Sequence, residues 1–170
     1  MISGATTLTV IVAVNSFCFV AVNICLSKPN SVFVILSLIS PTEFIKISDG
    51  ILNTVDDLEK YKGHLFNWYS ILDKQPMYPR YVSSVDSGNF FMALEFCYEE
   101  LSPNSKRICD KILGECDFDF LVDKNKNLLY TGFNTMTNTR DGGRYDILAS
   151  ESLLTYIFCI GHGKIDVKCA

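Results

Sequence analysis

Apolar residues recur at helical spacing after Ser40. Steps of three or four residues place five side chains on one helix face: Phe44, Ile47, Ile51, Val55 and Leu58. Ser40 and Glu43 have the spacing of a capping box, and Pro41 occupies the first helical position, where its missing N–H costs nothing. The pattern therefore predicts an amphipathic helix that begins at Ser40 and ends near residues 61–63.

Later apolar patterns predict three more helices and one hairpin. We expect helices over residues 88–101, 102–114 and 144–160. Residues 118–122 and 128–133 have the length of short strands and flank a polar turn, which is typical of a β-hairpin. The predicted fold class is therefore mainly α with one small β-hairpin.

Residues 61–89 form an aromatic and irregular stretch in the middle of the chain. They include Trp68, which is the single tryptophan of the sequence. Pro76 and Pro79 break any long helix here, because proline cannot donate a backbone hydrogen bond and disfavours helix before it. Long loops of this kind are usually functional, and flat aromatic faces suit sugar rings. The alternative is a surface loop held in place by its aromatic side chains.

The start of the chain differs from the rest in polarity. Residues 1–27 carry no charged side chain, and the apolar run over residues 7–26 is long enough to cross a bilayer as a helix. A buried core helix, or a β-rich segment around residues 7–14, is the alternative. We expect an apolar segment over residues 1–39 and a domain over residues 40–170, with membrane association through the apolar run or, failing that, a cytoplasmic location.

Composition excludes several functions. The formal net charge is −4, with 15 basic and 19 acidic residues, so no basic stripe is available for nucleic acid. Seven cysteines without C-x-x-C spacing argue against a disulfide framework, and two histidines make a metal site improbable. No metal and no cofactor is expected.

Glu151 is the first of two candidate catalytic acids. It falls within the helix expected over residues 144–160, whose apolar residues cover nearly the whole circumference. A carboxylate in such a helix must be paired, neutralised or turned toward a polar cavity. The alternative to a functional role is a salt bridge to Arg144 or Arg140.

Asp86 is the second candidate acid. It lies beside the aromatic stretch and follows Ser83 at the spacing of a helix cap, which is a sufficient structural reason for an acid there. Glycoside chemistry needs two acids that flank the sugar bond, one to protonate the leaving oxygen and one to attack or to activate a water. The sequence does not establish that Asp86 and Glu151 face each other.

Several blocks of the chain together form a pattern more specific than any single motif. They are Tyr-Lys-Gly-His-Leu-Phe-Asn-Trp-Tyr at 61–69, Pro-Arg-Tyr-Val-Ser-Ser-Val-Asp-Ser-Gly-Asn at 79–89, Asp-Phe-Asp-Phe-Leu-Val-Asp at 117–123, the segment 128–133, and Tyr-Asp-Ile-Leu-Ala-Ser-Glu at 145–151. In this order they resemble the central glucoamylase-like region of cyclic β-1,2-glucan synthases. The resemblance extends over about residues 40–164.

The resemblance implies an (α/α)6 toroid of paired helices with an active cleft at one end of the ring. It also implies β-1,2-linked glucan as substrate and hydrolysis or transglycosylation as reaction. Asp86 and Glu151 would be the acid and the nucleophile or base. The side chains that would bind the sugar are His64, Asn67, Trp68, Tyr69, Arg80, Tyr81, Tyr145 and Asp146.

The chain departs from this pattern in two ways. A closed toroid needs about twelve helices, more than 170 residues can hold, so we expect an incomplete toroid. The basic residue expected shortly after Glu151 is absent, since Ser152, Leu153 and Leu154 follow it. Two interpretations therefore stay open. One is a carbohydrate-active fragment of a hydrolase or transglycosylase, and the other is a non-catalytic, membrane-associated or glycan-binding remnant.

Overall fold

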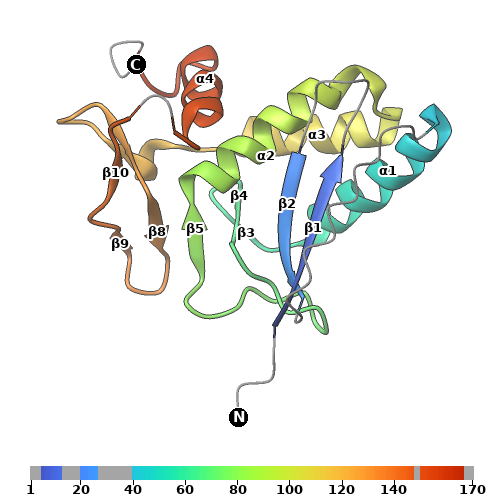
Figure 1. The fold of residues 1–170 in the computed structure, drawn as a ribbon, viewed down its shortest axis with the longest axis horizontal. Coiled ribbons are helices and arrows are strands. Elements are labelled where there is room, and N and C mark those ends of the chain that lie inside the picture. Colours follow the sequence, from blue (N-terminus) through green and yellow to red (C-terminus); the bar gives the residue numbers. More distant parts are fainter. Residues whose placement is uncertain (1–4, 13–19, 27–39, 148–149, 167–170) are drawn as a thin grey trace.

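The computed structural model describes residues 5–12, 20–26, 40–147 and 150–166 (Figure 1). Its four α-helices are α1 (Pro41–Asp57), α2 (Ser84–Cys97), α3 (Pro103–Glu115) and α4 (Leu153–Gly161). Short 3₁₀ helices cover Tyr98–Glu100 and Asp119–Leu121. Helix α1 packs against α3, and α2 packs against α4.

Side-chain caps start three of these helices. Ser40 Oγ accepts a hydrogen bond of 3.3 Å from the Glu43 amide, and Ser102 Oγ accepts one of 3.2 Å from the Ser105 amide. The helix starts expected at Ser40 and Ser102 are confirmed. Helix α2 begins earlier than expected, because Ser83 is its cap.

The described strands pair antiparallel in four small sheets. The first sheet pairs β1 (Ala5–Val12) with β2 (Val20–Leu26), and the second pairs β3 (Lys60–Tyr61) with β4 (His64–Leu65). The third has the order β10-β7-β6, with β6 Val122–Asp123, β7 Leu128–Tyr130 and β10 Arg144–Tyr145. The fourth has the order β5-β8-β9, with β5 Tyr81–Ser83, β8 Gly132–Asn134 and β9 Thr139–Arg140.

The predicted fold class is wrong. The molecule is mixed α/β with several small antiparallel sheets, rather than a mainly α, incomplete toroid with one hairpin. The expected hairpin exists between β6 and β7, but residues 128–133 divide into β7 and β8, which belong to different sheets. Strands of two or three residues are too short to show an alternating pattern, so most of them could not be predicted from local periodicity.

The helix expected over residues 144–160 is also wrong in its first half. Arg144 and Tyr145 form strand β10, which pairs with β7, and α4 begins only at Leu153. Pairing with a strand distant in the sequence overrides the local apolar pattern. As a result, Glu151 precedes α4 instead of lying inside it.

Helix α2 is central, and buried residues occur on all its sides. Figure 1 shows it running between α1 and α3 at one end of the molecule and α4 with β10 at the other. The ring of Phe91 lies 5.4 Å from that of Phe158 on α4 and 5.9 Å from that of Phe118. At Gly88 a β-carbon would lie 2.2 Å from Thr155 Oγ1, so only glycine lets α2 and α4 approach this closely.

The apolar start of the chain forms strands where it is described. β1 and β2 pair antiparallel, and β2 contacts α2. A helix over residues 7–26 is therefore wrong for these two segments, and the alternative of a β-rich segment holds for residues 7–12; residues 13–19 lie outside the described part. None of the described helices has the length and apolar character needed to cross a membrane. Membrane association through residues 7–26 stays a prediction.

Candidate functional site

Tyr145 lies near both candidate acids. Its phenol donates a hydrogen bond of 2.9 Å to Glu151 Oε1. Burial raises the pKa of Tyr145, and the bond to Glu151 and the negative charges of Glu151 and Asp86 raise it further, because each disfavours the phenolate. Both carboxylates therefore lie close enough to act on one phenol. Asp86, Tyr145 and Glu151 are named the Tyr145 cluster below.

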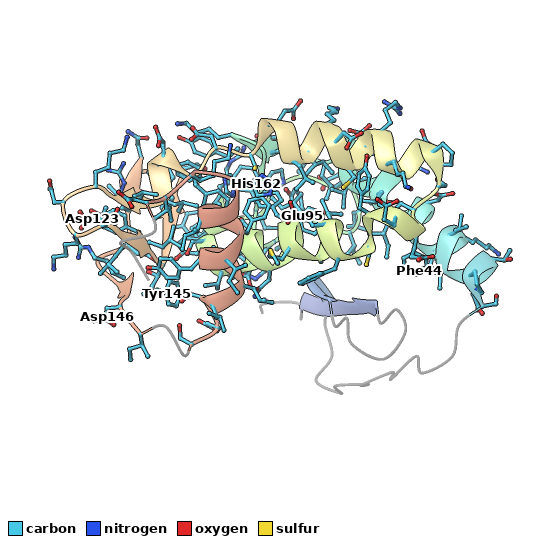
Figure 2. The ribbon with its side chains drawn as sticks, turned by 90° about the horizontal axis from the view of Figure 1, so that it is seen from above. Phe44, Glu95, Asp123, Tyr145, Asp146 and His162 are labelled. Atoms are coloured by element: carbon cyan, nitrogen blue, oxygen red, sulfur yellow. The ribbon has the colours of Figure 1, made fainter. Side chains whose placement is uncertain are left out.

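The surrounding fold fixes the backbone of Tyr145. Tyr145 lies opposite Leu129 in the third sheet, and its carbonyl accepts a hydrogen bond of 2.6 Å from the Tyr156 hydroxyl of α4. The same hydroxyl accepts a bond of 3.0 Å from the Leu129 amide. One buried tyrosine thus joins β10, β7 and α4. Figure 2 shows Tyr145 and Asp146 together at this end of the molecule, and Asp146 is exposed.

Asp86 stands in the first turn of α2. Its amide donates a hydrogen bond of 3.2 Å to Ser83 Oγ, so the capping arrangement expected from the sequence is present. Its carboxylate is exposed, and a negative charge at a helix start is favourable because it complements the helix dipole. The helix cap uses the amide of Asp86, so its carboxylate stays accessible to a ligand.

Glu151 is exposed and lies in the turn before α4, so the expectation that it is enclosed by an apolar helix is wrong. The ion pair considered as its alternative role does not form with either arginine. Arg144 Nε instead lies 2.5 Å from Asp123 Oδ2, and Arg140 Nε donates to the Phe120 carbonyl at 2.7 Å. Glu151 thus has Tyr145 as its hydrogen-bond donor.

Trp68 and Tyr81 extend the site along an aromatic surface. Their ring centroids lie 6.3 Å apart with an interplanar angle of 32°, and 36% of Trp68 is exposed. The Tyr81 hydroxyl donates a hydrogen bond to Asp141. Burial raises the pKa of Tyr81, Asp141 raises it further, and the nearby Tyr145 adds to the shift. Tyr81 therefore lies near both Trp68 and Tyr145.

His64 and Asn67 make structural contacts. His64 is fully buried, and its Nε2 lies 2.8 Å from the Asp117 carbonyl, which requires the proton on Nε2. Burial lowers the pKa of His64 to about 4, so the ring is neutral at pH 7. Asn67 Oδ1 accepts a hydrogen bond of 3.0 Å from the Ser83 amide at the start of α2.

Tyr69 and Arg80 are also bound within the protein. The Tyr69 hydroxyl donates to the Glu59 carbonyl at 2.6 Å and accepts from the Phe66 amide at 2.9 Å. Arg80 forms an ion pair with Glu59, and its guanidinium lies 4.8 Å from the centre of the Phe66 ring. Sugar contacts by these four side chains stay a prediction.

The sequence did not point to Asp141 or Thr131. Thr131 Oγ1 donates a bond of 3.3 Å to Asp141 Oδ2, the oxygen that also accepts from Tyr81. The one local signal is that Asp141 is followed by two glycines, which is typical of a tight turn. Nothing in the spacing connects Asp141 with Tyr81, sixty positions earlier.

Comparison with known proteins gives one short similarity. A segment of 36 residues, 21% of this chain, is 67% identical to the cyclic beta-(1,2)-glucan synthase NdvB of Rhizobium meliloti (strain 1021). The match covers 1% of the length of NdvB. No family model matches the chain. The similarity supports a link to cyclic β-glucan synthases over that segment.

Proposed function

We propose that this chain is a carbohydrate-active fragment that binds β-1,2-linked glucan and carries an acid pair for glycoside hydrolysis or transglycosylation. The observation that carries the proposal is the Tyr145 cluster, in which one phenol is bonded to Glu151 and lies within electrostatic reach of Asp86. The short similarity to a cyclic beta-(1,2)-glucan synthase supports the choice of glucan.

The two acids have different surroundings, which suggests different roles. Tyr145 donates a hydrogen bond to Glu151, which holds this carboxylate in position, as an attacking or water-activating group requires. Glu151 is therefore the candidate nucleophile or base. Asp86 is the candidate acid that protonates the leaving oxygen.

The aromatic surface supplies the sugar contacts. Trp68, Tyr81 and Tyr145 offer ring faces to the apolar sides of glucose units, and the exposed Asp146 offers hydrogen-bond acceptors. In this arrangement the glucan lies across Tyr81 with one glycosidic bond at the Tyr145 cluster.

A non-catalytic glycan-binding role is the second candidate. Asp86 and Glu151 are both exposed, whereas a catalytic proton donor usually lies in a less polar environment that keeps it protonated near neutral pH. Binding through the aromatic surface does not need such an environment.

Incubating the purified chain with β-1,2-linked glucooligosaccharides separates the two candidates. Enzymatic action predicts shorter or cyclic products on chromatography, and Glu151→Gln and Asp86→Asn should each lower the rate at least a hundredfold, since each removes a group that reacts. Glu99→Gln is the matched control, because Glu99 is exposed and lies beyond the far end of α2. Binding without products favours the second candidate, and a chain that neither binds nor cleaves the glucan contradicts the proposal.

A further inference from the structure

The phenol of Tyr81 is held by residues that come together only in the folded chain. Its hydroxyl donates to Asp141 Oδ2, and Thr131 Oγ1 donates to the same oxygen at 3.3 Å. A β-carbon at Gly132 would lie 2.1 Å from the Tyr81 hydroxyl oxygen, so the phenol occupies the space that a side chain there would need.

Backbone contacts fix the residues around this phenol. Tyr81 is opposite Asn134 in the pairing of β5 with β8, and the Asp141 amide donates to the Gly132 carbonyl at 3.0 Å. The backbone of Asp141 is therefore anchored to the strand that pairs with the strand of Tyr81. The bond from the Tyr81 hydroxyl to the Asp141 carboxylate then limits the rotation of the ring.

We propose that Asp141 is a positioning residue that holds Tyr81 beside Trp68 in a sugar subsite formed by Trp68, Tyr81 and Tyr145. The proposal rests on the proposed glucan binding and names the residue on which its geometry depends. The Tyr81 ring lies 6.3 Å from that of Trp68. Tyr145, the third ring of the proposed subsite, carries the bond to Glu151.

A fixed ring matters because stacking on a sugar is directional. A tyrosine free to rotate loses conformational entropy when a ligand orders it, and that loss weakens binding. The bond to Asp141 orders the ring before the ligand arrives, and hydrogen bonds to a charged acceptor are among the stronger ones in proteins. Removing the carboxylate should therefore weaken binding even though Asp141 itself need not touch the glucan.

Fluorescence of Trp68, the single tryptophan, reports on the subsite directly. Titrating the chain with a β-1,2-linked glucooligosaccharide should change this emission, and Asp141→Ala should raise the Kd about tenfold, as expected for a lost charge-assisted hydrogen bond. Asp141→Asn keeps an oxygen that accepts from Tyr81 and should stay within about threefold of the original Kd. Glu99→Ala removes the same charge from a distant exposed position and should leave the Kd unchanged.

A second variant makes the result independent of the folding of Asp141→Ala. Tyr81→Phe keeps the ring and removes the bond to Asp141, so it should weaken binding about as much as Asp141→Ala. Combining both changes should add little, because they remove one interaction. The pKa of Tyr81, followed by NMR of labelled tyrosine and assigned with Tyr81→Phe, should fall in Asp141→Ala without any glucan present.

The outcomes distinguish this inference from the proposed function. If the original chain binds no glucan, the proposed function and the subsite both fail, whatever the pKa of Tyr81 does. If the original chain binds glucan but Asp141→Ala or Tyr81→Phe binds it equally well, the proposed function stands and the positioning role of Asp141 is overturned. An unchanged pKa of Tyr81 in Asp141→Ala overturns it as well.

Discussion

His64 shows how burial controls the chemistry of one residue. Its ring is enclosed by Phe91, Phe118 and Phe120, with centroid distances between 4.7 and 5.3 Å. Among the described residues, its Nδ1 has no hydrogen-bond partner. A charged imidazolium would have to give up its hydration in these surroundings, so the neutral ring is strongly favoured.

This burial predicts a stability that depends on pH. The pKa of His64 is lowered from 6.5 to about 4, so the unfolded chain binds a proton at a pH where the folded chain does not. The contribution of His64 is fully present above pH 6.5 and is lost as the pH falls toward 4, by about 3 kcal/mol in total. Urea unfolding at a series of pH values measures this loss.

The second histidine of the chain is the control for this experiment. His64→Gln should remove the His64 part of the decline, while His162→Gln should retain it, because His162 is exposed. NMR titration of the His64 ring gives an independent test. A normal pKa for that ring would show that the site is hydrated and that the prediction is wrong.

Residue type alone did not show which contacts each tyrosine of the aromatic stretch would make. The Tyr69 hydroxyl bonds to the Glu59 carbonyl and the Phe66 amide, which are near in sequence, whereas the Tyr81 hydroxyl bonds to Asp141. The partners of Tyr81 lie in distant sequence, so no local pattern could identify them. The residue pattern singled out Asp86 and Glu151, and the resemblance added Tyr145, but the hydrogen bond between Tyr145 and Glu151 required the fold.

At the scale of elements, two helical glycines have opposite surroundings. Gly50 lies in α1 and is exposed, with no atom near the position of an added β-carbon. Gly88 lies in α2, where an added β-carbon would lie 2.2 to 2.5 Å from three atoms of Thr155. The first glycine only lowers helix propensity, whereas the second allows α2 and α4 to pack.

These surroundings predict opposite effects of the same substitution. Gly50→Ala should stabilise the protein by up to about 1 kcal/mol, because alanine restricts the unfolded chain and favours helix. Gly88→Ala should destabilise it by about 1–3 kcal/mol, because the new methyl group forces α2 and α4 apart. Urea unfolding of both variants checks the pair, and a stabilised Gly88→Ala would mean that the two helices are not in close contact.

The starts of α1 and α3 could be predicted because caps are local. Ser40 and Ser102 each cap a helix through an amide three residues later, a relation visible in the sequence. Ser83 has the same relation to Asp86, but α2 was expected to begin only at residue 88. The short strands could not, since β5 exists only through its pairing with β8, about fifty residues away. The same applies to β10, whose pairing with β7 displaces the helix that the apolar residues suggested.

In the whole molecule, one hydrophobic core joins the four helices of the described residues. Its buried residues extend from Phe44 in α1 to Ile165 beyond α4. The Tyr145 cluster lies at one end of this core, where α4, β10 and the start of α2 meet (Figure 2). The geometry of the site should therefore depend on packing that lies well away from it.

Phe91 tests whether this core unfolds as one unit. It is fully buried in α2, and its ring contacts those of His64, Phe118 and Phe158, which come from three other parts of the chain. Phe91→Ala leaves a cavity among all of them and should lower the free energy of unfolding by about 3–5 kcal/mol. Because the ring joins these parts, circular dichroism and Trp68 fluorescence should report the same lowered urea midpoint.

Phe96 provides the matched control on the same helix, since it is 57% exposed. Phe96→Ala removes the same group from a position that is largely hydrated already, so the free energy of unfolding should change by about 0.5 kcal/mol or less. Equal losses in the two variants would contradict the placement of Phe91 at the centre of the core. Separate midpoints for the two probes in Phe91→Ala would show that the region around Trp68 and the helices unfold independently, and the site would then not depend on the core.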